Sequence, residues 1–202
     1  MNRMRLPALA LALGMLLAPL SGCSVAAKQA FYTVMGAQGK FYETSVVSPS
    51  LLASYRSIRV EPFTNELGDR VPPEVVAEVN DHTPEAIAES ALFYPEGKPL
   101  RVTGRIIHYT GRSGLQGSVW SVAGSAEECV CRVQLLDGIS GDLVGEAVCW
   151  GAVKSAVRRG SGELGTGVGK GVSKWIRKRL PEEEKERRRA ELGGEEEEEE
   201  QK

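Results

Sequence analysis

The sequence has few of the residues from which a catalytic or metal-binding centre is built. Among its 202 residues are 2 histidines and 4 cysteines. It lacks the G-x-S-x-G and H-E-x-x-H motifs of hydrolases, and the C-x2-C spacing of most zinc sites is absent too. We therefore expect no catalytic residues, no bound metal and no cofactor.

An excess of positive charge is also missing. The formal net charge is −2, and it becomes about −4 when Arg3 and Arg5 are removed with the signal segment described below. Proteins that bind nucleic acids usually carry a basic surface, because phosphate contacts dominate their affinity. We therefore expect no nucleic acid among the partners.

A complete phosphate-binding loop is missing as well, although GTGVGKGVSK, residues 165–174, looks like one at first. That loop requires G-x-x-x-x-G-K-[ST], in which backbone amides hold phosphates and the hydroxyl group binds magnesium. Here Leu164 stands in place of the first glycine and Gly171 in place of the hydroxyl residue. We expect no nucleotide; instead Gly167 and Gly171, one helical turn apart, would let a helix lie close against a sheet.

One long apolar run is present, and it stands at the start of the chain. Arg3 and Arg5 precede the run Leu6–Leu17, and a segment of mostly small residues ends at Cys23. This order of basic, apolar and small residues is typical of a secretory signal peptide. The run is shorter than the roughly 20 residues that span a membrane. The sequence therefore predicts a signal peptide over residues 1–22.

The end of this segment, Leu20-Ser21-Gly22-Cys23, resembles a bacterial lipobox. The resemblance implies that the signal is cut before Cys23, that Cys23 is lipidated, and that the membrane is a partner of the mature chain. Ser24 is not the aspartate that typically retains such proteins at the inner membrane, so the resemblance favours the periplasmic face of the outer membrane. The alternatives are a plain signal peptide with an incidental Cys23 and an uncleaved anchor.

Residues 23–44 are interpreted as the lipidated N-terminus followed by a short amphipathic helix, interrupted near Gly36 and Gly39. The helix is expected because the apolar residues follow helical spacing; they are Phe31, Val34, Met35, Phe41 and Tyr42. The alternative is a flexible linker with incidental aromatic residues. The short tether predicts that the folded part lies close to the membrane surface.

Two short helices are expected in the middle of the chain. The first begins near Pro72 and reaches Val79. Thr83 followed by Pro84 is typical of a helix cap with proline at the first helical position, so a second helix should begin there. His82 lies at the junction between the two, where turn and cap residues explain the neighbouring polar side chains better than a catalytic role does.

Four segments are predicted to be strands: residues 56–63, 98–111, 127–137 and 142–152. The first two flank the helices, an order that favours a parallel pair joined by a right-handed crossover. The last two form a hairpin. Its outer face should carry Arg132, Gln134 and Glu146, and its inner face Cys129, Cys131, Val133, Leu135, Leu143, Ala147 and Cys149.

The cysteines of this hairpin are disulfide candidates, because an exported protein meets an oxidising compartment. The shared inner face allows Cys131 to lie opposite Cys149, which makes them the candidate pair; Cys129 is left over or exchanges with Cys131. The alternative is a zinc site that recruits His108, which falls on the same face of its strand as Val102 and Ile106. We expect a core or strand-end histidine rather than a metal ligand.

The C-terminal part divides into a packed helix and a charged tail. The helix has an apolar face formed by Val168, Val172, Trp175 and Ile176. Residues 181–202 are expected to form a solvated tail that is disordered at its end, where six glutamates follow one another. Within the tail, Glu183 can pair with Arg187 and Glu184 with Arg188, one helical turn apart.

These elements predict an α+β fold, a two-layer domain over residues 45–180 with a four-stranded mixed sheet. The strand YRSIRVEPF, the strand LRVTGRI, the hairpin turn in LLDGISGDLVGE and the closing helix GTGVGKGVSKW resemble an uncharacterised bacterial lipoprotein family. They are similar, more distantly, to the small periplasmic domains of curli-secretion and penicillin-binding-protein-activator lipoproteins. The resemblance implies no catalytic residues.

The leading hypothesis for function is a non-enzymatic module, anchored in the membrane, that binds another envelope protein through a sheet edge or exposed loops. The alternative is a periplasmic protein that binds a small ligand or an envelope polymer through the loop YTGRSGLQGSVW, residues 109–120. An enzyme is a third reading with little in the sequence to support it.

Overall fold

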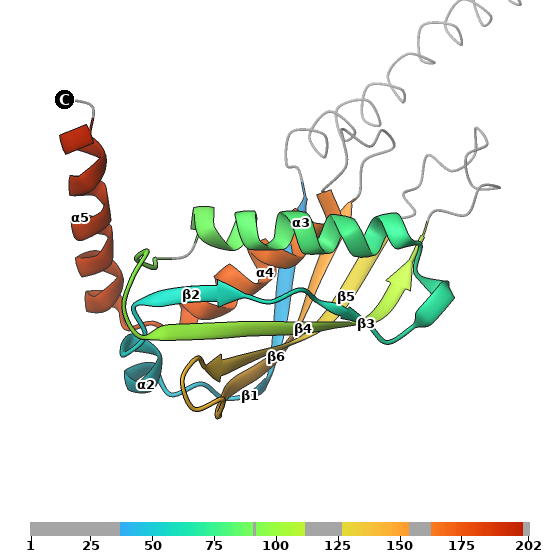
Figure 1. Ribbon diagram of the computed structural model, residues 1–202, viewed down its shortest axis with the longest axis horizontal. Helices are drawn as coiled ribbons and strands as arrows, with labels where there is room; N and C mark the ends of the chain where they lie inside the picture. The colour runs from blue at the N-terminus through green and yellow to red at the C-terminus, as the bar shows by residue number, and fades with distance from the viewer. Residues whose placement is uncertain (1–36, 91, 112–126, 154–162, 200–202) are drawn as a thin grey trace, which may run out of the picture.

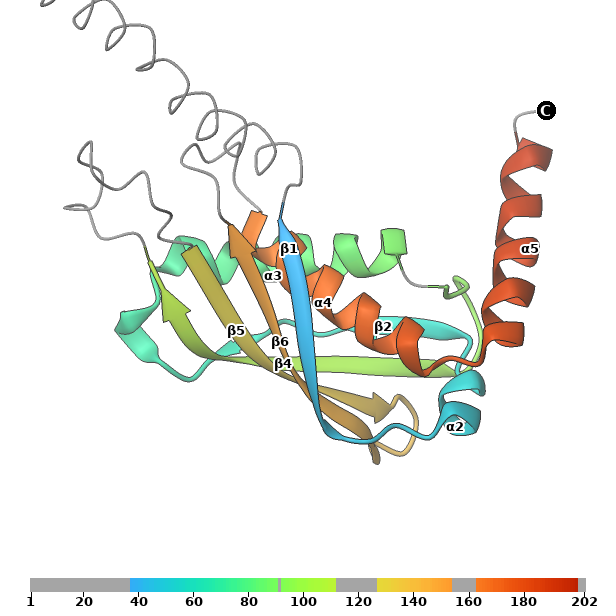
Figure 2. The same cartoon turned by 180° about the vertical axis from the view of Figure 1, so that it is seen from behind.

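Six strands form one mixed sheet in the computed structural model, and the long helices α3 and α4 lie on one face of it (Figures 1 and 2). The structure describes residues 37–90, 92–111, 127–153 and 163–199, without the side chains of Ser90 and of residues 193–199. The α+β class is confirmed. The prediction of four strands is wrong, because β1 and β3 also join the sheet.

The strand order is β1-β6-β5-β4-β2, and β3 pairs with β4 beyond the end of β2. The strands are β1 Gln38–Ser45, β2 Ser57–Val60, β3 Thr64–Asn65, β4 Pro99–Thr110, β5 Glu127–Asp137 and β6 Leu143–Val153. The helices among the described residues are α2 Pro49–Ala53, α3 Pro73–Ser90, α4 Glu163–Arg179 and α5 Glu182–Glu199, with a 3-10 turn at Gly68–Arg70. The predicted parallel pair is confirmed as β2 with β4.

Strand β1 corrects the expectation of a helix that reaches residue 43. Its backbone pairs antiparallel with β6, so that Phe41 lies opposite Cys149 and Tyr42 opposite Val148. Successive side chains in a strand point to opposite faces, which places Phe41 toward the core and leaves Tyr42 exposed. Gly39 occupies a position that faces the helices, where an apolar side chain would be expected. The sequence of β1 therefore lacks the regular alternation of apolar and polar residues that predicts a strand.

Helix α3 corrects the expectation of two separate helices. It runs without a break through Pro84, and Thr83 does not cap a helix. Thr83 is fully buried instead, and its hydroxyl group donates a hydrogen bond to the carbonyl oxygen of Gly165 at 3.1 Å. The expected junction is therefore a contact between α3 and α4.

The hairpin of β5 and β6 has the expected register over most of its length. Cys131 lies opposite Cys149, and Gln134 lies opposite Glu146. The inward position predicted for Leu143 is wrong, because the register shifts between Leu135 and Leu136. Leu143 therefore points outward and is 53% exposed.

Helix α4 packs on the sheet at backbone distance, as the glycine spacing predicts. A Cβ atom placed on Gly167 would lie 2.7 Å from the Cα atom of Gly151 in β6. One placed on Gly171 would lie 2.6 Å from the carbonyl oxygen of Lys40 in β1. The predicted apolar face is confirmed too, since its four side chains are fully buried: Val168, Val172, Trp175 and Ile176. Each such side chain contributes about 1.5–3 kcal/mol on burial.

A second pair of glycines in α4 faces helix α3. A Cβ atom on Gly169 would lie 2.7 Å from the carbonyl oxygen of Thr83 in α3. Gly165, one turn earlier, lies against the backbone of Glu78. Helix α4 is thus held between the sheet and α3, and no side chain at these four glycine positions separates the backbones.

Glu43 fastens the edge strand β1 to the end of α4. Its carboxylate accepts hydrogen bonds from the indole N–H of Trp175 at 3.0 Å and from Nε of Arg179 at 2.9 Å. Burial alone would raise the pKa of Glu43, but these two donors outweigh it and hold the pKa below its usual value. The carboxylate therefore stays charged and bonded to both partners at neutral pH.

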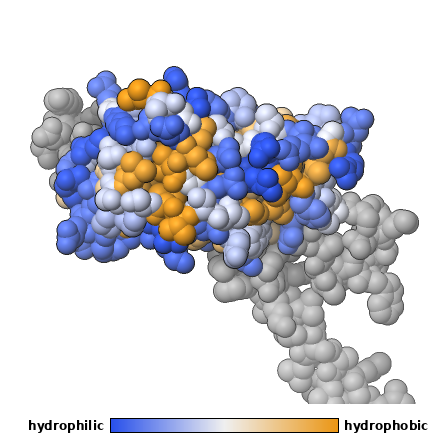
Figure 3. Space-filling view, turned by 90° about the horizontal axis from the view of Figure 1, so that it is seen from below, coloured by the Kyte–Doolittle hydropathy of each residue, from blue (hydrophilic) through white to orange (hydrophobic). Residues whose placement is uncertain are grey.

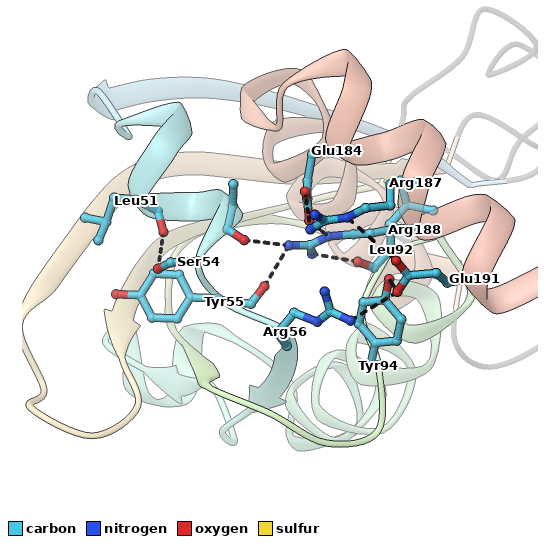
Figure 4. Close-up of polar contacts among 11 residues, drawn as sticks. Leu51, Ser54, Tyr55, Arg56, Leu92, Tyr94, Glu184, Arg187, Arg188 and Glu191 are labelled. Atoms are coloured by element: carbon cyan, nitrogen blue, oxygen red, sulfur yellow. Dashed lines mark hydrogen bonds and ion pairs between the residues drawn. The ribbon is translucent and has the colours of Figure 1, made fainter.

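Helix α5 contributes a buried arginine, although the sequence pattern predicts a solvated tail (Figure 4). Arg188 is 0% exposed and pairs with Glu184 at 2.6 Å, as predicted. Its guanidinium group also donates to the carbonyl oxygens of Leu92, Ala53 and Tyr55, so that it ties α5 to the chain after α3 and to the end of α2. These carbonyl groups belong to residues far from α5 in the sequence, so the pattern of charges within the tail could not predict them as partners of Arg188.

The other predicted pair of α5 is not formed. Arg187 contacts Glu184 at 2.5 Å and Glu191 at 3.7 Å rather than Glu183. Glu191 also accepts hydrogen bonds from Arg56 and from the hydroxyl group of Tyr94, whose ring lies under the Arg56 guanidinium group (Figure 4). Packed contacts therefore continue past residue 180, where the domain was expected to end.

We predict that Gly171→Ala destabilises the protein by about 1–3 kcal/mol, because the added methyl group overlaps the backbone of β1. In an exposed helix the same change would stabilise by up to about 1 kcal/mol, so the sign distinguishes the two environments. Urea unfolding measures the effect, with Thr166→Ala in the same helix as control. A Gly171→Ala protein as stable as the native chain would contradict the close packing of α4 on β1.

We predict that Arg188→Ala destabilises the protein by about 2–4 kcal/mol, because three carbonyl groups lose their donor and the buried Glu184 keeps only Arg187 as a partner. Arg189→Ala is the matched control, since Arg189 is exposed on the same helix and its replacement should change stability by no more than about 0.5 kcal/mol. Thermal and urea unfolding compare the two. Equal stabilities for both variants would show that α5 is not fastened through Arg188.

Candidate functional site

Several residues singled out from the sequence lie outside the described part of the chain. These are the lipobox with Cys23 and most of the loop proposed for ligand binding, residues 112–120. Lipidation at Cys23 therefore stays a prediction. Among the residues that the structure describes, no helix has the length and apolar character needed to cross a membrane.

The three remaining cysteines are free thiols in this structure, and all are fully buried. Cys131 lies opposite Cys149 and 3.9 Å, sulfur to sulfur, from Cys129. Contact with Cys129 and then burial raise the pKa of Cys131, and burial raises the pKa of Cys149. A raised pKa and full burial disfavour the thiolate form of Cys131 and Cys149, and the thiolate is the nucleophilic form. The Cys131–Cys149 disulfide stays a prediction, and the register is compatible with it.

His108 does not share a face with the core residues of β4, which corrects the geometry of the zinc alternative. A bulge between Ile106 and His108 turns the histidine outward. It is exposed, and its Nε2 lies 3.0 Å from the hydroxyl group of Thr110. In the described ranges no three His, Cys, Asp or Glu side chains come together as a metal site would require.

His82 lies within helix α3 rather than at a junction. Its Nδ1 lies 3.0 Å from a carboxylate oxygen of Glu85, one turn further along the same helix. This is a surface pair of a kind that contributes little to stability. Nothing in its described surroundings gives it a catalytic partner.

The face of the sheet opposite α3 and α4 is the strongest candidate for a functional surface; we call it the open face (Figures 1 and 3). Most side chains that point to the helices are fully buried, whereas most of those that point to the open face are half-buried or exposed. Cross-strand pairs arrange the open face in rows. One row holds Tyr42, Val148, Arg132 and Arg105, and the next holds Lys40, Trp150, Val130 and His108.

A polar network stands in the middle of the open face. Glu146 accepts hydrogen bonds from the Gln134 amide at 2.8 Å and from the Thr44 hydroxyl group at 3.1 Å. The bond from Gln134 is the main cause that holds the pKa of Glu146 below its usual value, and the charges of Arg132 and Arg105 act in the same direction. The surface here therefore favours negative charge. The sequence predicted that Arg132, Gln134 and Glu146 lie together, and the structure confirms it.

A depression of about 230 Å³ lies beside this network, next to the link between the end of β2 and the start of β3. Its walls are Glu61, Pro62, Thr64, Thr103, Gly104, Arg105, Arg132 and Gln134. The chain bends away from β4 at Pro62, because proline has no amide hydrogen for the ladder. Sequence reasoning missed this site, since it joins residues of β3, β4 and β5 with the link between β2 and β3, and no local pattern reveals how these segments align.

Exposed apolar side chains gather at the hairpin end of the sheet, where β1 ends and β6 begins. They are Val46 at 74%, Leu51 at 40%, Ile139 at 78% and Leu143 at 53% exposure. Figure 3 shows hydrophobic side chains in more than one group on the face seen from below. Single exposed apolar residues are normal, but a group of them marks an interaction surface.

No protein-family model matches the chain, and no curated protein matches it either. Among solved structures, the PelC dodecamer from Paraburkholderia phytofirmans has a TM-score of 0.46 at 13% identity, over 67% of this chain and 96% of that chain. A variant of that protein gives a TM-score of 0.46 at 15% identity, over 67% and 95%. A candidate lipoprotein from Caulobacter crescentus CB15 gives 0.27 at 14%, over 73% and 96%.

These TM-scores and identities are too low to assign a family or a function. The resemblance to a lipoprotein family therefore stays a prediction. The function has to be argued from the residues of the open face, where the described part of the chain offers aromatic, basic and apolar side chains to a partner.

Proposed function

We propose that this chain is a lipid-anchored protein of the bacterial cell envelope that acts without catalysis and binds another envelope protein through the open face. The observation that supports it is the asymmetry of the sheet. One face is covered by α3 and α4, while the other carries the exposed side chains of Tyr42 and Arg132 and the half-buried side chain of Trp150. Tyrosine, tryptophan and arginine are the side chains most enriched at the energetic centres of protein interfaces.

The position of the predicted anchor supports a partner that lies away from the membrane. The chain from Cys23 enters the sheet at Gln38, and residues 24–36 reach at most roughly 50 Å when extended. Strand β1 then runs 8 residues to Ser45, which is about 26 Å. The exposed apolar side chains Ile139 and Leu143 therefore lie at the end of the sheet remote from the tether, where lipid would not cover them.

The first test concerns the anchor. We expect the native chain to stay with the membrane fraction after a high-salt wash, and Cys23→Ala to accumulate as an unlipidated precursor that the wash releases. Cys149→Ala controls for the loss of a cysteine as such. A Cys23→Ala protein that partitions like the native chain would remove the anchor from the proposal.

The second test concerns the open face. A photoreactive benzoylphenylalanine in place of Tyr42, which is 68% exposed, is expected to cross-link an envelope protein in living cells. The same amino acid in place of Ala88, exposed on α3, is the matched control and should give no specific product. Mass spectrometry identifies the product. Equal products from both positions, or none from position 42 in a membrane-bound protein, would refute docking through the open face.

A further inference from the structure

Two arginines lie directly opposite each other in the sheet. Arg105 of β4 and Arg132 of β5 are cross-strand partners, and both side chains line the depression on the open face. Like charges in this arrangement destabilise a pair of strands. An anion held between the two guanidinium groups would remove that repulsion, since arginine presents paired N–H donors that match a carboxylate.

The acidic residues around the depression contact other partners, so that the guanidinium group of Arg132 is available to bind an anion. Glu66 pairs with Arg105 at 2.6 Å, and Glu61 lies 3.5 Å from Nε of Arg101. Glu146 acts on Arg132 only through space, because it is bonded to Gln134 and Thr44. Within the described ranges Arg132 forms no ion pair and no hydrogen bond, and its side chain is exposed.

The depression has the size and lining for one acidic group. Its volume of about 230 Å³ lies below the range of roughly 300–1,000 Å³ that is usual for small-molecule pockets. Besides the arginines it offers hydroxyl groups from Thr64 and Thr103. Hydroxyl and guanidinium donors together suit an oxyanion.

We propose that this depression, the arginine notch, binds the carboxylate of an acidic side chain from the partner protein. The inference rests on the proposed function and names the chemistry of its partner. A peptide is favoured over a free inorganic anion because the row that contains the arginines continues across the sheet through Val148 to Tyr42. A carboxylate on a chain would fill the notch while neighbouring residues cover those two side chains, which a lone anion would leave exposed.

The test measures binding of blocked hexaglutamate to the lipidated full-length chain in neutral detergent micelles, by NMR of the arginine Nε–Hε groups at low salt. Blocked hexaglutamine and inorganic phosphate are the comparison probes. We expect hexaglutamate to shift the signals of Arg105 and Arg132, each identified by its loss in the corresponding glutamine variant. Hexaglutamine should cause no shift, and phosphate should bind at least about fivefold more weakly.

The matched variants are Arg132→Gln and Lys40→Gln, which each remove one positive charge from the open face. Arg132→Gln is expected to weaken hexaglutamate binding at least about fivefold, and Lys40→Gln less than about twofold. The melting temperature of Arg132→Gln should be unchanged or raised, because the cross-strand repulsion disappears. A lower melting temperature with unchanged peptide affinity would show that Arg132 supports the fold and not binding.

The remaining outcomes separate this inference from the proposed function. Equal affinity for phosphate and hexaglutamate, or equal weakening by both variants, would overturn a carboxylate site in the notch. Absence of hexaglutamate binding, together with a specific cross-link from position 42, would overturn the notch and leave docking through the open face intact. Absence of both would overturn the two proposals together.

Discussion

The contact between the backbone of α4 and the backbones of β1 and β6 is the constraint on which the rest of the structure depends. Gly167 and Gly171 on the helix meet Gly151 and Lys40 on the sheet with no side chain between them. The opposite side of the helix meets α3 in the same way. A helix held this closely on both sides fixes α3 and α4 as one layer. The two long helices α3 and α4 therefore cover the same face of the sheet, and the other face remains open to solvent.

Strand β1 connects this packing to the proposed function. It is an edge strand, and unpaired edges are prone to unwanted pairing. The position of β1 is fixed by the inward-pointing side chain of Glu43, which accepts hydrogen bonds from Trp175 and Arg179 at the end of α4. The same strand carries Tyr42 on the open face and receives the chain that comes from Cys23. One strand thus contributes to the proposed docking surface and is also the element that follows the predicted anchor segment in the chain.

Much of the core was predictable, because it depends on local periodicity. Val168, Val172, Trp175 and Ile176 follow the helical repeat, and the register of the hairpin follows from alternation. The first strand was not predictable, since Gly39 and Glu43 occupy inward positions for reasons that lie in α4. Thr83 likewise bonds to Gly165 of α4 instead of capping a helix, a contact with a distant segment that the local pattern does not show. The arginine notch needs the register of β4 against β5 and a break between β2 and β3, neither of which appears in any local pattern.

The separation of the two faces bears on how the open face can carry a function. Most of the fully buried apolar side chains of the sheet point toward the helices, so the open face contributes little to the core. Substitutions there are then limited by solubility and by binding rather than by folding. In the isolated sheet the two opposed arginines repel each other, although Arg105 also pairs with Glu66 and both charges favour the ionised form of Glu146. In the bound state, a partner's carboxylate in the notch would remove the repulsion that remains between them.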